Sequence, residues 1–139
     1  MAIYFHNEST DPPEINKKQV KNWIKNVISS YKKQVGDINY IFTNDENILK
    51  VNIKYLNHNF YTDVITFDYT SKNIISGDIY ISLDTVKSNS EKYNELYFDE
   101  LKRVIIHGIL HLIGYKDKTD IEAKEMRKQE NKALEIFLN

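Results

Sequence analysis

Apolar residues recur with a helical period near the start of the chain and with a period of two soon after it. Between residues 14 and 33, apolar side chains fall on one face and lysines on the other, which predicts a helix that Asp11 and Pro12 are suited to begin. Residues 37–43 alternate between apolar and polar, which predicts a half-buried strand. Asn44 then suits the N-cap of a short helix.

Two further segments, 63–68 and 77–82, are rich in β-branched and aromatic residues and are separated by a polar turn around residues 71–73. Thr119 and Glu122 have the spacing of a capping box, which predicts a helix start. Helical patterns cover the rest of the chain, at residues 84–94, 98–113 and 120–138. We therefore predict an α+β fold, with a small mixed β-sheet and about five helices in a single domain spanning residues 1–139.

Composition narrows the possible chemistry. A chain of 139 residues without cysteine can form one core but no disulfide, so any bound metal must be held by His, Asp or Glu. Its apolar runs are far too short to span a membrane, and its first residues lack the pattern of a secretory leader. We expect a cytoplasmic protein that has no membrane or disulfide partner.

Net charge does not point to a nucleic-acid binder. Nineteen Lys and Arg residues against 20 Asp and Glu residues give −1. The lysines of the first predicted helix could contact phosphate, but a solvated helix face explains them more simply.

His107 and His111 are one helical turn apart, so both imidazoles can converge on one ion. Gly114 is suited to end this helix and turn the chain so that Asp117 faces the same point. Three protein ligands leave one position for water, as in catalytic zinc sites. Alternatively, the histidines are hydrogen-bonded core residues, and Asp120 competes with Asp117 as the third ligand.

This spacing is also typical of metzincin peptidases. In those enzymes a Glu follows the first His as the general base, but Gly108 stands there in this chain. Glycine cannot accept a proton, so a zinc peptidase is a less favoured interpretation.

Residues 107–115 (HGILHLIGY) resemble the signature of the YbeY family of endoribonucleases and rRNA maturation factors. The similarity extends to residues 56–57 (LN), 62–67 (TDVITF) and 77–82 (GDIYIS) in the same order. The resemblance implies a small α+β fold with a zincin-like, three-ligand zinc site. It also implies action on single-stranded RNA, in rRNA maturation and quality control of the small ribosomal subunit.

Two departures from the family pattern affect the site. Asp117 stands where the family has a third histidine, and an oxygen ligand slightly favours other divalent metals such as Mn²⁺ or Fe²⁺. The family's arginine before the Thr-Asp-Val block is missing, and His58 is a candidate to replace it as a phosphate donor.

From these residues we predict metal-assisted hydrolysis of a phosphodiester, with a Zn²⁺ ion on His107, His111 and Asp117. The resemblance makes Asp63 and Asp78 the carboxylates best placed to line the cleft, and they join His107 as candidate catalytic residues. His58, Lys116 and Lys118 are candidate phosphate contacts, and Tyr61, Tyr69 and Tyr115 are candidate stacking rings. Each also has a simpler interpretation, such as a turn cap, a solvated lysine or a packed ring. An alternative function is a ribosome-associated RNA-binding factor whose metal site is mainly structural.

Overall fold

A computed structural model describes residues 2–59 and 62–137 of the chain. Along the sequence the elements are β1 (Ile3–Asn7), α1 (Lys17–Ser30), β2 (Gln34–Thr43), α2 (Asp45–Leu56), β3 (Val64–Asp68), β4 (Ile74–Ser82), α3 (Leu83–Lys92), α4 (Tyr97–Ile113) and α5 (Asp120–Phe137). This is the predicted α+β fold, with a mixed sheet and five helices in the described ranges.

The sheet has the strand order β1-β2-β4-β3. The first three strands of this order run parallel, and β3 pairs antiparallel with β4 at one edge. The two inner strands have 10 and 9 residues, whereas each edge strand has five. The central pair is therefore the most extensive part of the sheet.

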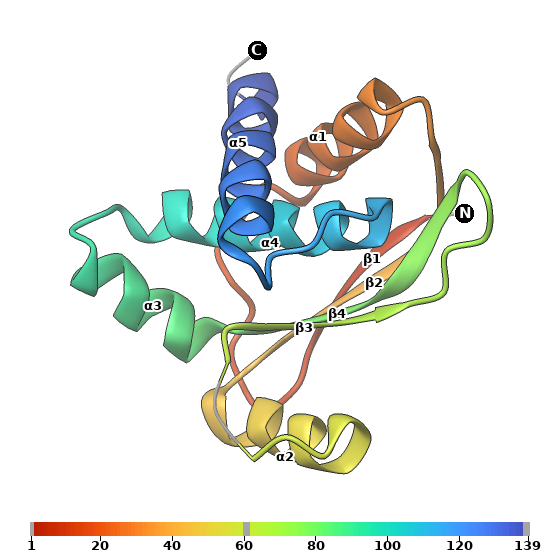
Figure 1. Cartoon of the computed structure of the whole chain (residues 1–139). Helices are drawn as coiled ribbons and strands as arrows, with labels where there is room; N and C mark the ends of the chain where they lie inside the picture. The colour runs from red at the N-terminus through yellow and green to blue at the C-terminus, as the bar shows by residue number, and fades with distance from the viewer. Residues whose placement is uncertain (1, 60–61, 138–139) are drawn as a thin grey trace.

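Helices α1, α4 and α5 lie on one side of the sheet and α2 lies on the other (Figure 1). The main core forms between the sheet and the first group, from fully buried side chains such as Ile24, Ile79 and Ile105. Gly108 lets α4 approach β4 closely, because a Cβ atom at this position would lie 2.8 Å from Cγ2 of Ile79. The predicted histidine helix is thereby held against the middle of the sheet.

The predicted elements are confirmed, with differences at their ends and one omission. Helix α1 begins after Asn16, whose side chain accepts a hydrogen bond from the Gln19 N–H, so the predicted start at Asp11 is wrong. The cause is the Pro12–Pro13 pair, because a residue before proline is disfavoured in helical conformation. Strand β1 was not predicted. Residue 138, the predicted end of the last helix, lies outside the described residues.

None of the helices within residues 2–59 and 62–137 combines the length and the hydrophobicity needed to cross a bilayer.

Candidate metal centre

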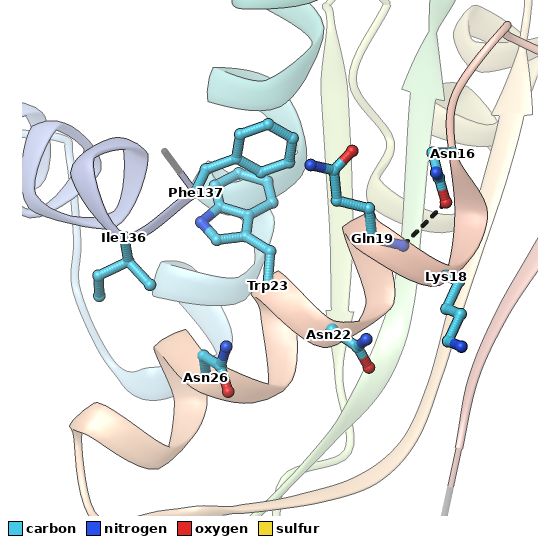
Figure 2. Close-up of a pocket in the computed structure, with 8 residues that line it drawn as sticks. All are labelled: Asn16, Lys18, Gln19, Asn22, Trp23, Asn26, Ile136 and Phe137. Atoms are coloured by element: carbon cyan, nitrogen blue, oxygen red, sulfur yellow. Dashed lines mark hydrogen bonds between the residues drawn. The ribbon is translucent and has the colours of Figure 1, made fainter. Parts of the chain in front are cut away.

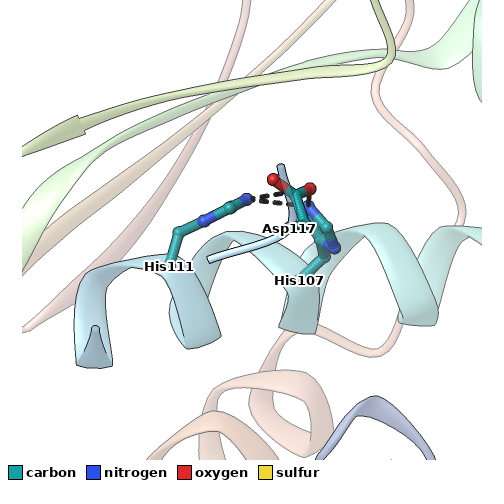
Figure 3. Close-up of side chains that lie close together, drawn as sticks. All are labelled: His107, His111 and Asp117. Carbon is teal, nitrogen blue, oxygen red and sulfur yellow. Dashed lines mark hydrogen bonds and ion pairs between the residues drawn. The ribbon is translucent and has the colours of Figure 1, made fainter. Parts of the chain in front are cut away.

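His107 and His111 project from the same face of α4, and Asp117 reaches them from the loop that follows (Figure 3). The two Nε2 atoms are 2.9 Å apart, and Oδ2 of Asp117 lies 3.2 Å from Nε2 of His107 and 3.4 Å from Nε2 of His111. The structure thus brings the three predicted ligands together.

Local backbone chemistry places Asp117 there. Helix α4 ends at Gly114, whose φ of +124° is a conformation that L side chains rarely adopt. Helix α5 begins at the predicted capping box, in which Thr119 and Glu122 exchange hydrogen bonds between side chain and backbone. The loop between the end of α4 and the start of α5 is short, so it passes directly over the helix face that carries the two histidines.

Both histidines are oriented through their other ring nitrogen. His107 donates from Nδ1 to Oε2 of Glu130 at 2.7 Å, and His111 donates from Nδ1 to the Tyr115 carbonyl at 3.0 Å. Since a carboxylate and a carbonyl only accept hydrogen bonds, these contacts assign the Nδ1 protons. Each neutral ring then presents the lone pair of Nε2 to the shared point, as metal-ligating histidines do.

The donor set fits a divalent cation. Its three ligand atoms lie within 4.8 Å of one another. Ligands at bond lengths of 2.0–2.1 Å in a tetrahedral zinc site are about 3.3 Å apart, close to the separations of these atoms. Two imidazoles and a carboxylate suit zinc and several other first-row divalent metals.

The surroundings of the trio shift the pKa values of the two histidines in opposite directions. Burial lowers the pKa of His107, but the hydrogen bond to Glu130 and the charges of Glu130, Asp117 and Asp63 raise it above its ordinary value. Burial and the neighbouring His107 lower the pKa of His111. Burial also raises the pKa of Asp63, against the opposing effect of His107.

Several other predicted site residues surround the trio. Asp63, His58 and Lys118 line one cleft together with the three candidate ligands. Lys116 is exposed and is not among the lining residues of that cleft.

Asp78 is not brought to this site. Its neighbours on β4, Gly77 and Ile79, face α4, so the side chain of Asp78 points to the opposite face of the sheet. There it accepts a hydrogen bond from Asn39 at 3.3 Å, and Asn39 accepts one from His6. The prediction that Asp78 lines the cleft is therefore wrong, because alternate strand residues face opposite sides.

The candidate stacking rings have different surroundings. Tyr61 lies outside the described residues, and Tyr69 is exposed after β3. The ring of Tyr115 packs edge-on against Tyr31, with ring centroids 5.9 Å apart, so this tyrosine contributes packing and its carbonyl.

Sequence reasoning missed Glu130 and gave no role to Arg103. Glu130 is only 5% exposed and accepts a hydrogen bond from Arg103 at 2.8 Å besides the one from His107. The two partners lower the pKa of Glu130, although burial alone would raise it. A signal was present, because Glu130 shares a helical face with Met126 and Ala133, and a carboxylate at a core position needs a buried partner.

A separate hollow lies between α1 and the end of α5 (Figure 2). Trp23 is one of its lining residues; it packs edge-on against Phe137 and donates a hydrogen bond to the Ala133 carbonyl. The other lining residues are mostly amides, and no histidine or carboxylate is among them.

Comparison with known proteins identifies the family to which this chain belongs. The family model described as Endoribonuclease YbeY matches residues 4–137. The chain belongs to the YbeY family. Two relatives are named Endoribonuclease YbeY. The one from Parabacteroides distasonis is 54% identical over 137 residues, which cover 99% of this chain and 96% of that protein. The one from Bacteroides thetaiotaomicron is 52% identical over 134 residues, which cover 96% of this chain and 98% of that protein. A solution structure from Thermotoga maritima is similar with a TM-score of 0.70 and 27% identity, covering 97% of this chain and 88% of that one.

Proposed function

We propose that this chain, as a single domain over residues 1–139, is a zinc-dependent endoribonuclease. The observation that carries the proposal is the convergence of His107, His111 and Asp117 on one point in a member of the YbeY family. Three protein donors leave a coordination position open for substrate or water, as catalytic sites require. When bound, such an ion supplies Lewis acidity to the phosphodiester and to an attacking water.

The chain's own residues have separate roles in this proposal. The three donors fix the position of the ion, and the Nδ1 contacts of His107 and His111 keep their rings in place. Asp63, at the entrance to β3 and in the same cleft, accepts the proton of the attacking water. The bond from phosphorus to the leaving oxygen breaks as the new bond to the water oxygen forms.

Phosphate contacts come from the rim of the cleft. Lys118 follows Asp117 by one residue, and His58 lies across the same cleft, so both can donate to the RNA backbone. Lys116 is exposed on the same loop and contributes charge at longer range. These contacts position the strand without reading its sequence.

The proposed substrate is single-stranded RNA, in small-subunit rRNA maturation and ribosome quality control in the cytoplasm. The resemblance of residues 62–67, 77–82 and 107–115 to the family signature supports this assignment.

The test uses metal-loaded protein and an unstructured RNA oligonucleotide. His111→Ala removes one donor and should lower the cleavage rate by at least about a hundredfold. His6→Ala is the matched control, since His6 contacts Asn39 far from the trio, and it should cleave like the wild type. Equal, trace-level cleavage by all three proteins would overturn the nuclease assignment and favour an RNA-binding factor with a structural metal.

The metal is tested separately by elemental analysis of protein purified without chelator. We expect close to one zinc ion per chain in the wild type and in His6→Ala, and strongly reduced zinc in His111→Ala. A stoichiometry near zero in the wild type that added zinc cannot raise would refute the site. Preferential retention of manganese or iron would show that the oxygen donor of Asp117 shifts the metal preference of the site away from zinc.

A further inference from the structure

The candidate metal centre opens into a second cleft. Asp63, His107 and Asp117 line both clefts, but the second runs away from His58 and Lys118, between the segment joining α3 to α4 and helix α5. It has a volume of about 390 Å³. Its remaining walls include Asn89, Tyr93, Glu95, Glu100, Arg103 and Arg127.

Both arginines of the sequence lie in this second cleft. The inner arginine, Arg103, is held by Glu130 at 2.8 Å and Asn131 at 3.1 Å, and its side chain is 20% exposed. The outer arginine, Arg127, has a side chain that is 60% exposed and approaches Glu130 only to 3.7 Å. The inner guanidinium is therefore held by two partners, whereas the outer one lines the cleft and is largely exposed.

The outer arginine lies close to the proposed catalytic centre. The Arg127 side chain approaches Oε1 of Glu130 to 3.7 Å, and Oε2 of the same carboxylate accepts from His107 at 2.7 Å. A single carboxylate thus separates this guanidinium from a candidate metal ligand. Planar guanidinium groups bind phosphate with two parallel hydrogen bonds, so Arg127 suits the phosphate of a nucleotide that neighbours the one at the metal centre.

Five carboxylates line the cleft, and three of them lie at the candidate metal centre: Asp63 and Asp117 line both clefts, and Glu130 contacts His107. Glu130 is already paired with Arg103 and His107. Burial and a hydrogen bond to Glu95 raise the pKa of Glu100 to about 7, which makes its ionised form less favourable. The outer arginine is the cation that remains available to a ligand.

An exposed ring completes the cleft. Tyr93 follows the last residue of α3 and is 60% exposed, although it is large and aromatic. Nζ of Lys92 lies 5.4 Å from the centre of its ring. Exposed rings combined with nearby cations are the usual platform for an unpaired base.

We propose that the second cleft binds a nucleotide next to the cleaved bond of single-stranded RNA, with its phosphate on Arg127 and its base stacked on Tyr93. This inference rests on the proposed function, because an endonuclease must hold its strand on both sides of the bond that it breaks. The first cleft, with His58 and Lys118, then takes the other side.

The test compares steady-state cleavage of an unstructured RNA oligonucleotide by metal-loaded variants. Arg127→Ala should raise KM about tenfold and leave kcat within about threefold, since the contact is away from the reacting atoms. Tyr93→Ala should raise KM roughly threefold to tenfold, and Tyr93→Phe should restore it because the ring remains. Lys128→Ala, an exposed neighbour on α5 outside the cleft, is the matched control and should change KM less than about twofold.

Two further measurements make the result specific. The slope of log K for RNA binding against log salt concentration, measured by fluorescence anisotropy on metal-free protein, should become less negative by about 0.7 in Arg127→Ala. The zinc affinity of that variant should equal the wild-type value. Lower zinc affinity would show that Arg127 only supports Glu130, which would overturn the proposal.

The remaining outcomes separate the two proposals. If the wild type cleaves RNA and both Arg127→Ala and Tyr93→Ala behave like Lys128→Ala, the second cleft is not a nucleotide site and the proposed function stands. If the wild type neither binds nor cleaves RNA, the proposed function fails, and this inference fails with it.

Discussion

Glu130 and Glu100 are both buried, at 5% and 8% exposure, yet their pKa values shift in opposite directions. Glu130 accepts hydrogen bonds from His107 and Arg103, so its ionised form is favoured. Glu100 has another carboxyl group, that of Glu95, as its hydrogen-bond partner, and burial together with this partner favours its neutral form. Because the two side chains are buried to a similar extent, the difference between them comes from their neighbours.

The raised pKa of Glu100 predicts a pH-dependent stability. Its pKa is about 7 in the folded protein, against the ordinary value of 4.5, so the folded state binds more protons between these values. Stability from this group is therefore present at low pH and is lost as pH rises towards the folded pKa. We expect the free energy of unfolding of Glu100→Gln, relative to that of the wild type, to increase by roughly 1–3 kcal/mol when the pH is raised from about 5 to about 8.

Urea denaturation of metal-free protein at the two pH values measures this difference. Glu91→Gln, an exposed substitution on α3, is the control and should give the same difference from wild type at both pH values. A Glu100→Gln variant that gained nothing at the higher pH would show that Glu100 is ionised without penalty.

At the scale of elements, α4 depends on two glycines for different reasons. Gly108 is needed for close contact, since an added Cβ would meet Ile79 at 2.8 Å. Gly114 has free space around it but a φ of +124°, so its requirement is conformational. One glycine sets how deeply the helix lies on the sheet, and the other sets where the helix stops.

We predict that Gly108→Ala lowers the free energy of unfolding by about 1–3 kcal/mol through overpacking, even though alanine favours a helix by up to about 1 kcal/mol. Denaturant unfolding measures this effect. Gly114→Ala is the informative comparison, because any loss there comes from backbone strain and should be accompanied by weaker zinc binding as Asp117 shifts. Unchanged or greater stability in Gly108→Ala would mean that α4 can move off β4 at no cost.

The helices and the ligand trio could be predicted because their signals are local. His107, His111 and Asp117 lie within one helix and its following loop, and periodicity marks each helix directly. Strand β1 could not be found in this way, since it has only five residues and only Ile3 among them is buried, which leaves no clear alternation. The contact of Glu130 with His107 joins two helices, which no spacing in the sequence reveals.

At the scale of the whole molecule, the site joins elements that otherwise meet only through the core. Its donors come from α4 and the loop after it, its hydrogen-bonded support comes from α5, and Asp63 comes from the start of β3. Disturbing the packing of any of these elements therefore disturbs the site. Conversely, filling the site should stabilise the whole fold.

Zinc should accordingly raise the free energy of unfolding, by about 2.7 kcal/mol at a free concentration one hundred times Kd. Thermal or denaturant unfolding with buffered zinc measures this increase. His6→Ala should show the full increase, whereas His111→Ala should show little. An equal increase in both variants would place the bound zinc elsewhere on the protein.

The distribution of donors along the chain has a consequence for the order of assembly. All three candidate ligands precede α5 in the sequence, and only afterwards does synthesis reach Glu130. A growing chain therefore presents every metal donor before the carboxylate that orients His107 exists. The hydrogen bond that orients His107 therefore depends on the last helix to be synthesised.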